Sequence, residues 1–102
     1  MKRYSIIISD NAYSDIQNIL DYISTEYQSP LTARRYVAGL YATIDKLANY
    51  ATSLAVNKSQ HILHLYGSGI RRVNYKKVAI LYMVDGNYVI IQRILKADLI
   101  TK

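Results

Sequence analysis

The 102-residue sequence has no cysteine, phenylalanine or tryptophan, and only one proline. Without cysteine, neither disulfide bonds nor thiolate zinc sites can form, and a reducing cytoplasm is the expected location. No run approaches the ~20 apolar residues that a transmembrane helix requires, and the basic start at Met1 leads into only a short apolar run. We therefore expect neither a membrane anchor nor a signal peptide.

The composition is that of one small packed domain. The chain is 51% hydrophobic and 20% charged, which excludes a disordered tail, and its length leaves room for a single core over residues 1–102. The net charge of +6 is uneven. Residues 1–56 carry five basic and five acidic groups, whereas residues 57–102 carry eight and two. This asymmetry favours an anionic partner for the second half.

The first half predicts a strand followed by two helices. Residues 4–9 form a short apolar run typical of a strand, and Ser9 or Asp10 can cap the helix that follows. Apolar residues then recur at spacings of three and four as far as Tyr27, which indicates an amphipathic helix. Ser29 and Pro30 are a second helix start, and the pattern continues to residue 51. The short connection predicts an antiparallel helical hairpin.

The second half predicts three strands after a loop. Residues 52–68 have a poor pattern, with a short ordered piece over 62–66. Strand patterns then cover 70–75, 78–84 and 88–95, and residues 85–87 form a strong hairpin turn. The predicted fold class is α+β: an N-terminal strand and a helical hairpin on a small antiparallel sheet that ends in a three-strand meander.

Both faces of the last two predicted strands are apolar. On the strand over 78–84, Leu81 and Met83 lie on the face opposite Ile80 and Tyr82. A sheet with helices on one side would normally present one polar face. We therefore expect a partner to cover part of the second face. The alternative is that the loop over 52–68 or the C-terminal residues cover it.

Basic residues cluster on these strands. Arg71, Arg72, Lys76 and Lys77 surround one hairpin, and Arg93 and Lys96 lie on the neighbouring strand. Strand alternation should send Arg71 and Arg72 to opposite faces, so that one of them belongs to the basic patch.

His61 and His64 are spaced to share a metal on a helix, but no third ligand is near in the sequence, so we expect no metal and no cofactor.

The order and spacing of several motifs resemble the RelE/ParE superfamily of bacterial type II toxins. The resemblance runs from Ser9 to Asp98. Its motifs are Ala12 with Asp15-Ile16 and Tyr22-Ile23, Ser29-Pro30 with Ala33 and Tyr36, Gly69-x-Arg71, Ile80-x-Tyr82-x-Val84, and Val89-x-Ile91-x-Arg93-Ile94-Leu95.

The resemblance implies a cytoplasmic toxin of a plasmid-stabilisation system, neutralised by a cognate antitoxin. It allows a homodimer or a heterotetramer with the antitoxin. RelE-like members cleave messenger RNA on the ribosome with basic side chains and often a C-terminal tyrosine or histidine. ParE-like members inhibit DNA gyrase by binding it.

The RelE-like arginines are missing at two places in this sequence. Their positions fall at Ala79 and Ala97, and the C-terminal tyrosine has no counterpart. Because alanine cannot stabilise a transferring phosphoryl group, we predict a ParE-like gyrase inhibitor that is not an enzyme. Ala97 also departs from the arginine of many ParE-like toxins, which puts activity of either kind in question.

Two alternatives stay open. The first is a RelE-like endoribonuclease, for which the candidate catalytic residues are Arg71, Arg72, Arg93 and His64. The second is a degenerate toxin that only binds its antitoxin. For binding of the target or of the antitoxin, the candidate contact residues are Arg71, Arg72, Lys76, Lys77, Arg93, Lys96, Leu81 and Met83.

Overall fold

The computed structural model describes residues 3–53, 56 and 60–96. Ala97, a position used in the sequence comparison, lies outside the described residues, and so does the side chain of His61. Among the described residues, eight elements follow one another: β1 (Ser5–Ile8), α1 (Asp10–Glu26), α2 (Pro30–Tyr50), the 3-10 turn η1 (Ala51–Ser53), α3 (Gln60–Tyr66), β2 (Arg71–Tyr75), β3 (Val78–Asp85) and β4 (Tyr88–Lys96).

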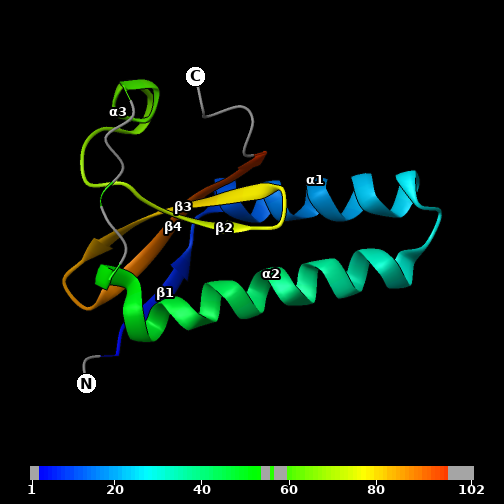
Figure 1. The fold of residues 1–102 in the computed structure, drawn as a ribbon, viewed down its shortest axis with the longest axis horizontal. Coiled ribbons are helices and arrows are strands. Elements are labelled where there is room, and N and C mark those ends of the chain that lie inside the picture. Colours follow the sequence, from blue (N-terminus) through cyan, green and yellow to red (C-terminus); the bar gives the residue numbers. More distant parts are fainter. Residues whose placement is uncertain (1–2, 54–55, 57–59, 97–102) are drawn as a thin grey trace.

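Both long helices begin where the sequence predicts. Ser9 caps α1 by accepting a hydrogen bond from the backbone N–H of Ala12 at 3.1 Å. Ser29 caps α2 in the same way for Thr32 at 3.2 Å, and Pro30 occupies the first turn. The two helices run side by side as a hairpin whose far end projects beyond the sheet (Figure 1).

Within the part of the chain that the structure describes, the sheet has four strands in the order β1-β4-β3-β2. The predicted meander is confirmed, because β2, β3 and β4 pair antiparallel in sequence order. β1 pairs parallel with β4, so the sheet is mixed, whereas the sequence had suggested an antiparallel one. The poorly patterned segment contains the short helix α3, which extends the ordered piece expected over 62–66.

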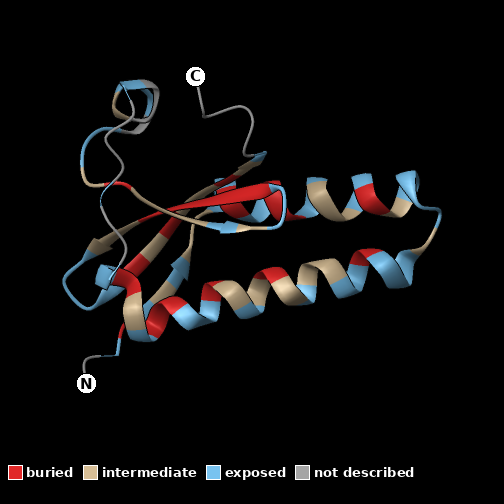
Figure 2. Cartoon of the chain, viewed as in Figure 1, coloured by how far each residue is buried: buried red, intermediate tan, exposed pale blue. Residues whose placement is uncertain are grey.

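The main core lies between the helical hairpin and one sheet face. Its fully buried side chains come from both helices and from β3 and β4, among them Ile16, Leu40, Ile80, Tyr82 and Ile91 (Figure 2). The Tyr82 hydroxyl donates a 2.7 Å hydrogen bond to the carbonyl of Ala51 at the end of α2. The hairpin therefore buries its apolar stripe against the sheet, as expected for this fold class.

The second sheet face is only partly exposed. Ile70, Ala79 and Leu81 form a separate buried cluster against which Met83 and Leu95 pack. Leu81 has no exposed surface, so a direct partner contact expected for its side chain does not fit this structure. The part that stays open lies toward β1, where Ile7 is 43% and Tyr88 is 50% exposed.

No helix in the described part of the chain is both long and apolar enough to span a membrane.

Candidate functional site

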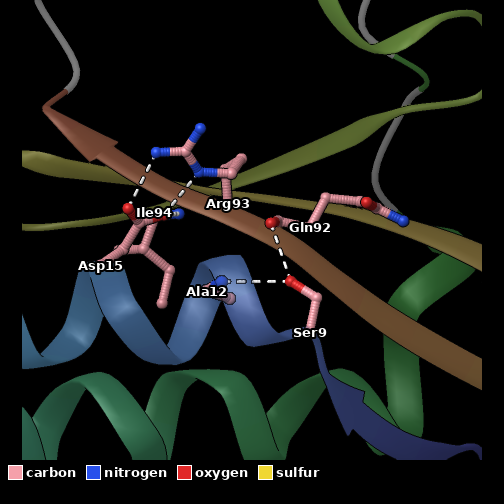
Figure 3. A network of polar contacts seen from close by, with 6 residues as sticks. All are labelled: Ser9, Ala12, Asp15, Gln92, Arg93 and Ile94. Atoms are coloured by element: carbon pink, nitrogen blue, oxygen red, sulfur yellow. Dashed lines mark hydrogen bonds and ion pairs between the residues drawn. The ribbon is translucent and has the colours of Figure 1, made fainter.

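An ion pair joins the start of α1 to β4 (Figure 3). The Asp15 carboxylate accepts hydrogen bonds from the Nε and Nη2 atoms of Arg93 at 2.8 and 2.9 Å. It also accepts one from the backbone N–H of Ile94 at 2.8 Å. The pairing of β1 with β4 ends at Ile91. Beyond that point the Asp15 carboxylate, in place of a neighbouring strand, accepts the hydrogen bond of a β4 backbone N–H. Arg93 is therefore held in place by a buried acid.

Ser9 extends the same junction. Its hydroxyl donates to the carbonyl of Gln92 at 3.0 Å while it caps α1. The register of β4 against β3 shifts here, because Leu81 pairs with Arg93 and Tyr82 pairs with Ile91. Gln92 is the extra residue of this bulge, and its side-chain amide contacts the Met83 sulfur at 3.2 Å. The bulge bends β4 where α1 replaces β1 as its neighbour.

A groove of about 1200 Å³ lies between the helical hairpin and the nearby end of the sheet. Its aliphatic lining includes Ile19 and Ile23 on α1, Val78 on β3, and Ile94 and Leu95 on β4. Three polar residues also line it, namely Asp15, Asn18 and Thr32, of which Asp15 is paired with Arg93. The remaining lining residues are tyrosines and lysines, namely Tyr22, Tyr27, Tyr36, Lys76, Lys77 and Lys96. The groove thus combines an apolar floor with positive charge.

Two of these lysines lie against aromatic rings. The ammonium of Lys76, in the β2–β3 turn, is 5.4 Å from the ring centroid of Tyr36 and 5.6 Å from that of Tyr75. The ammonium of Lys96 is 5.1 Å from the ring centroid of Tyr22. Burial, and secondarily the nearby Tyr75, raises the pKa of Tyr36 above its usual value, so this phenol stays neutral at physiological pH.

The two neighbouring arginines of β2 lie on opposite faces, as the alternation predicts. Arg71 pairs in register with Tyr82 on the helix side, and Arg72 pairs with Leu81 on the other side. Burial raises the pKa of Tyr82 to about 12, although the positive charge of Arg71 lowers it in part. The Nε of Arg72 donates to the Asn74 side chain at 2.8 Å.

The candidate nuclease residues do not form one cluster. Arg72 and Arg93 both pair with Leu81 across the strands, but the guanidinium of Arg93 is turned to Asp15 on α1. Arg71 lies on the opposite face, and His64 lies exposed on α3. No group of three metal-ligating side chains occurs among the residues that the structure describes.

The structure brings together only part of the predicted basic patch. Lys76, Lys77 and Lys96 share the groove, whereas Arg71 and Arg72 lie elsewhere on β2. The sequence reasoning missed the role of Asp15, although its place three residues after buried Ala12 on the apolar stripe was a usable signal. It also missed the tyrosines beside the lysines, because those contacts join residues far apart in the chain.

The arrangement of strand, helical hairpin and three-strand meander defines a class, the RelE/ParE superfamily of small toxins. Residues 6–98 match the family model described as the ParE toxin of the type II toxin–antitoxin system parDE. The chain therefore belongs to the ParE toxin family, and it is a toxin of the type II toxin–antitoxin class.

Solved structures share the fold. A chain of the chromosomal ParDE toxin–antitoxin system from P. aeruginosa is 20% identical with a TM-score of 0.76, covering 92% of this chain and 96% of that one. A chain of the toxin–antitoxin complex RelBE2 from Mycobacterium tuberculosis is 14% identical with a TM-score of 0.58, covering 92% and 98%. A search among curated sequences gave no match.

Proposed function

We propose that this toxin inhibits DNA gyrase by binding it, that it does not cleave RNA, and that a cognate antitoxin neutralises it in the cytoplasm. In this proposal the pair serves plasmid stabilisation. Membership of the ParE family supports gyrase as the target, and the arrangement of the basic side chains supports binding over catalysis.

The observation that carries the proposal is the separation of the candidate catalytic groups. RNA cleavage needs a base at the 2′-hydroxyl, an acid at the leaving oxygen and cations on the same phosphate. Arg71 and Arg72 lie on opposite faces of β2, and Arg93 is bound to Asp15. Ala79, where a RelE-like enzyme has an arginine, is fully buried.

The test is a supercoiling assay with purified gyrase and relaxed plasmid. The expected result is loss of supercoiling together with accumulation of cleaved DNA, and restoration of supercoiling when antitoxin is added. The same preparation, added to translating ribosomes, should leave messenger RNA intact by primer extension. Codon-specific cuts with unimpaired gyrase would establish the enzyme instead.

We assign the antitoxin to the groove between the hairpin and the sheet. The groove offers aliphatic side chains such as Ile19 and Val78 beside three lysines. Its charge complements an acidic segment, and its floor complements an apolar stripe. An amphipathic acidic segment of the antitoxin fits both properties.

A further inference from the structure

The lysines of the groove differ in how their side chains are held. Lys76 lies against two rings, Tyr36 and Tyr75, which meet edge to face with their centroids 5.1 Å apart. Lys96 lies over one ring, that of Tyr22. Lys77 has no ring contact within the part of the chain that the structure describes. The same groove thus contains two ring-held ammonium groups and one that is not.

The two-ring platform under Lys76 is fixed by α2. The Tyr75 ring lies over Gly39, where an added Cβ would be 2.9 Å from the ring Cζ. Tyr36 precedes Gly39 by one helical turn on the same helix. The Tyr75 ring therefore occupies a space beside α2 that any side chain at residue 39 would fill, and the Tyr36 ring packs against its edge. The platform is built before any partner arrives.

The two ring-held lysines border the same end of the sheet. Lys96 pairs across the strands with Val78, and Val78 follows the turn that carries Lys76. Tyr22, which supports Lys96, comes from α1, whereas Tyr36 comes from α2. Each helix of the hairpin therefore supports one cation beside the apolar floor of the groove.

The face of a tyrosine ring attracts an ammonium group electrostatically, but it forms only weak hydrogen bonds with the N–H groups of that ammonium. Those donors stay available for a carboxylate. A lysine that is already held also loses less side-chain freedom when it pairs than a freely rotating one does. Ring-held lysines should therefore contribute more to binding an acid than a free lysine of equal charge.

We propose that Lys76 and Lys96 are the specificity-determining charges of the groove, and that they select an antitoxin segment with carboxylates flanking an apolar stripe. This inference rests on the proposed function, because it takes the groove to be the antitoxin site. A protein segment fits better than a nucleic acid. The floor residues Ile19, Ile23 and Val78 are aliphatic, and the rings of Tyr22 and Tyr36 are engaged by Lys96 and Lys76, which leaves them less available to stack on bases.

The test compares three single substitutions that each remove one positive charge from the groove. The probe is the full-length antitoxin candidate encoded by the reading frame that adjoins this gene, and its affinity is measured by calorimetry. We expect Lys76→Gln and Lys96→Gln to raise Kd about five- to tenfold, and the matched control Lys77→Gln about twofold or less. Equal losses in all three variants, or no loss in any, would overturn the proposal.

A double-mutant cycle tests the rings themselves while leaving the charges in place. Tyr22→Leu should raise Kd about threefold in the wild-type background and leave it unchanged in the Lys96→Gln background. Strictly additive effects would show that the Tyr22 ring does not act on binding through Lys96, which contradicts the inference. Thermal melts of each variant show whether the fold is retained.

Two controls separate this inference from the proposed function. If the wild-type chain fails to bind the antitoxin candidate, the proposed partner itself is wrong. If antitoxin binding is unaffected by the substitutions while binding of a single-stranded 20-nucleotide DNA is lost, the groove reads nucleic acid and the inference is overturned. Gyrase inhibition by the free Lys76→Gln and Lys96→Gln variants is measured separately and reports on the proposed function alone.

Discussion

At the scale of single residues, Asp15 is a buried charge whose carboxylate holds two parts of the chain together. It accepts three hydrogen bonds, two of them from Arg93 and one from the backbone of Ile94. Its side chain is 10% exposed, and that of Arg93 is 32% exposed. The carboxylate of Asp15 is therefore more shielded from water than the guanidinium of Arg93. Replacing Asp15 with a neutral residue leaves the Arg93 guanidinium beside an uncharged group.

We expect Asp15→Asn to lower the free energy of unfolding by about 2 kcal/mol, because it weakens a charge-assisted pair and turns one acceptor into a donor. Urea denaturation followed by circular dichroism measures this change. Asp21→Asn is the matched control, since Asp21 is exposed on the same helix, and it should change stability by less than about 0.5 kcal/mol. Equal effects of the two substitutions would contradict a structural role for the pair.

Tyr82 supplies a pH-dependent contribution to stability. Burial raises the pKa of its phenol to about 12 from the model-compound value of 10.0. The folded state thus holds this proton more tightly than the unfolded state does. The contribution is fully present below pH ~10 and is lost as the pH rises toward ~12, and its size is on the order of 2 kcal/mol.

Tyr82→Phe should lower stability at neutral pH by about 1 kcal/mol, because the Ala51 carbonyl loses the donor that lies 2.7 Å away. The substitution should also flatten the fall in stability between pH 10 and 12. Denaturant titrations of both proteins across this range measure the two slopes. Parallel curves for the variant and the wild type would show that another group governs the alkaline loss.

At the scale of elements, the close contact between α2 and β2 depends on Gly39. A glycine inside a helix normally costs about 1 kcal/mol relative to alanine. Here a methyl group at residue 39 would overlap the Tyr75 hydroxyl and lie 2.9 Å from the ring Cζ. The glycine therefore accommodates a strand side chain against the helix.

The effect of Gly39→Ala should therefore change sign with the residue at position 75. In the wild-type background we expect a loss of about 1 kcal/mol, because the Tyr75 ring must leave its slot. In a Tyr75→Ala background the same substitution should stabilise by about 1 kcal/mol through helix propensity alone. Thermal denaturation of the four proteins measures both values. A gain in both backgrounds would contradict the contact.

Elements whose signals are local were predictable, and those that depend on distant partners were not. Ser9 and Ser29 fixed the helix starts because a cap and its first turn adjoin in sequence. The parallel pairing of β1 with β4 was not predicted, since Ser5 and Tyr88 meet only after the chain has folded. The bulge at Gln92 could not be predicted for the same reason, because it is defined by the pairing of β4 with β3.

In the candidate site, too, features with local sequence signals were predictable and contacts between distant residues were not. Lys76, Lys77 and Lys96 are the part of the predicted basic patch that lines the groove, because a hairpin and its neighbouring strand place them at one end of the sheet. The assignment of Arg93 to that patch missed its partner, since Asp15 lies 78 residues away. The second apolar face was recognised from strand alternation, but the burial of Leu81 within the chain was not.

At the scale of the whole molecule, the positive charge should govern how fast a partner arrives. The net charge of +6 resides entirely in residues 57–102, and three of those charges line the groove. Opposite charges accelerate encounter more than they slow dissociation, and salt screens them over roughly 10 Å at 0.1 M. The association rate with an acidic antitoxin should therefore fall steeply with ionic strength.

We expect the association rate constant to fall about tenfold or more between 0.05 and 0.5 M salt, with little change in dissociation. The variant that replaces Lys76, Lys77 and Lys96 with glutamine should bind more slowly and lose most of this salt dependence. Stopped-flow or surface-plasmon measurements give both rates. The matched control removes three charges from exposed positions on α2, Arg34, Arg35 and Lys46. If both triple variants lose the salt dependence equally, net charge alone steers the antitoxin, and the groove has no special part in its capture.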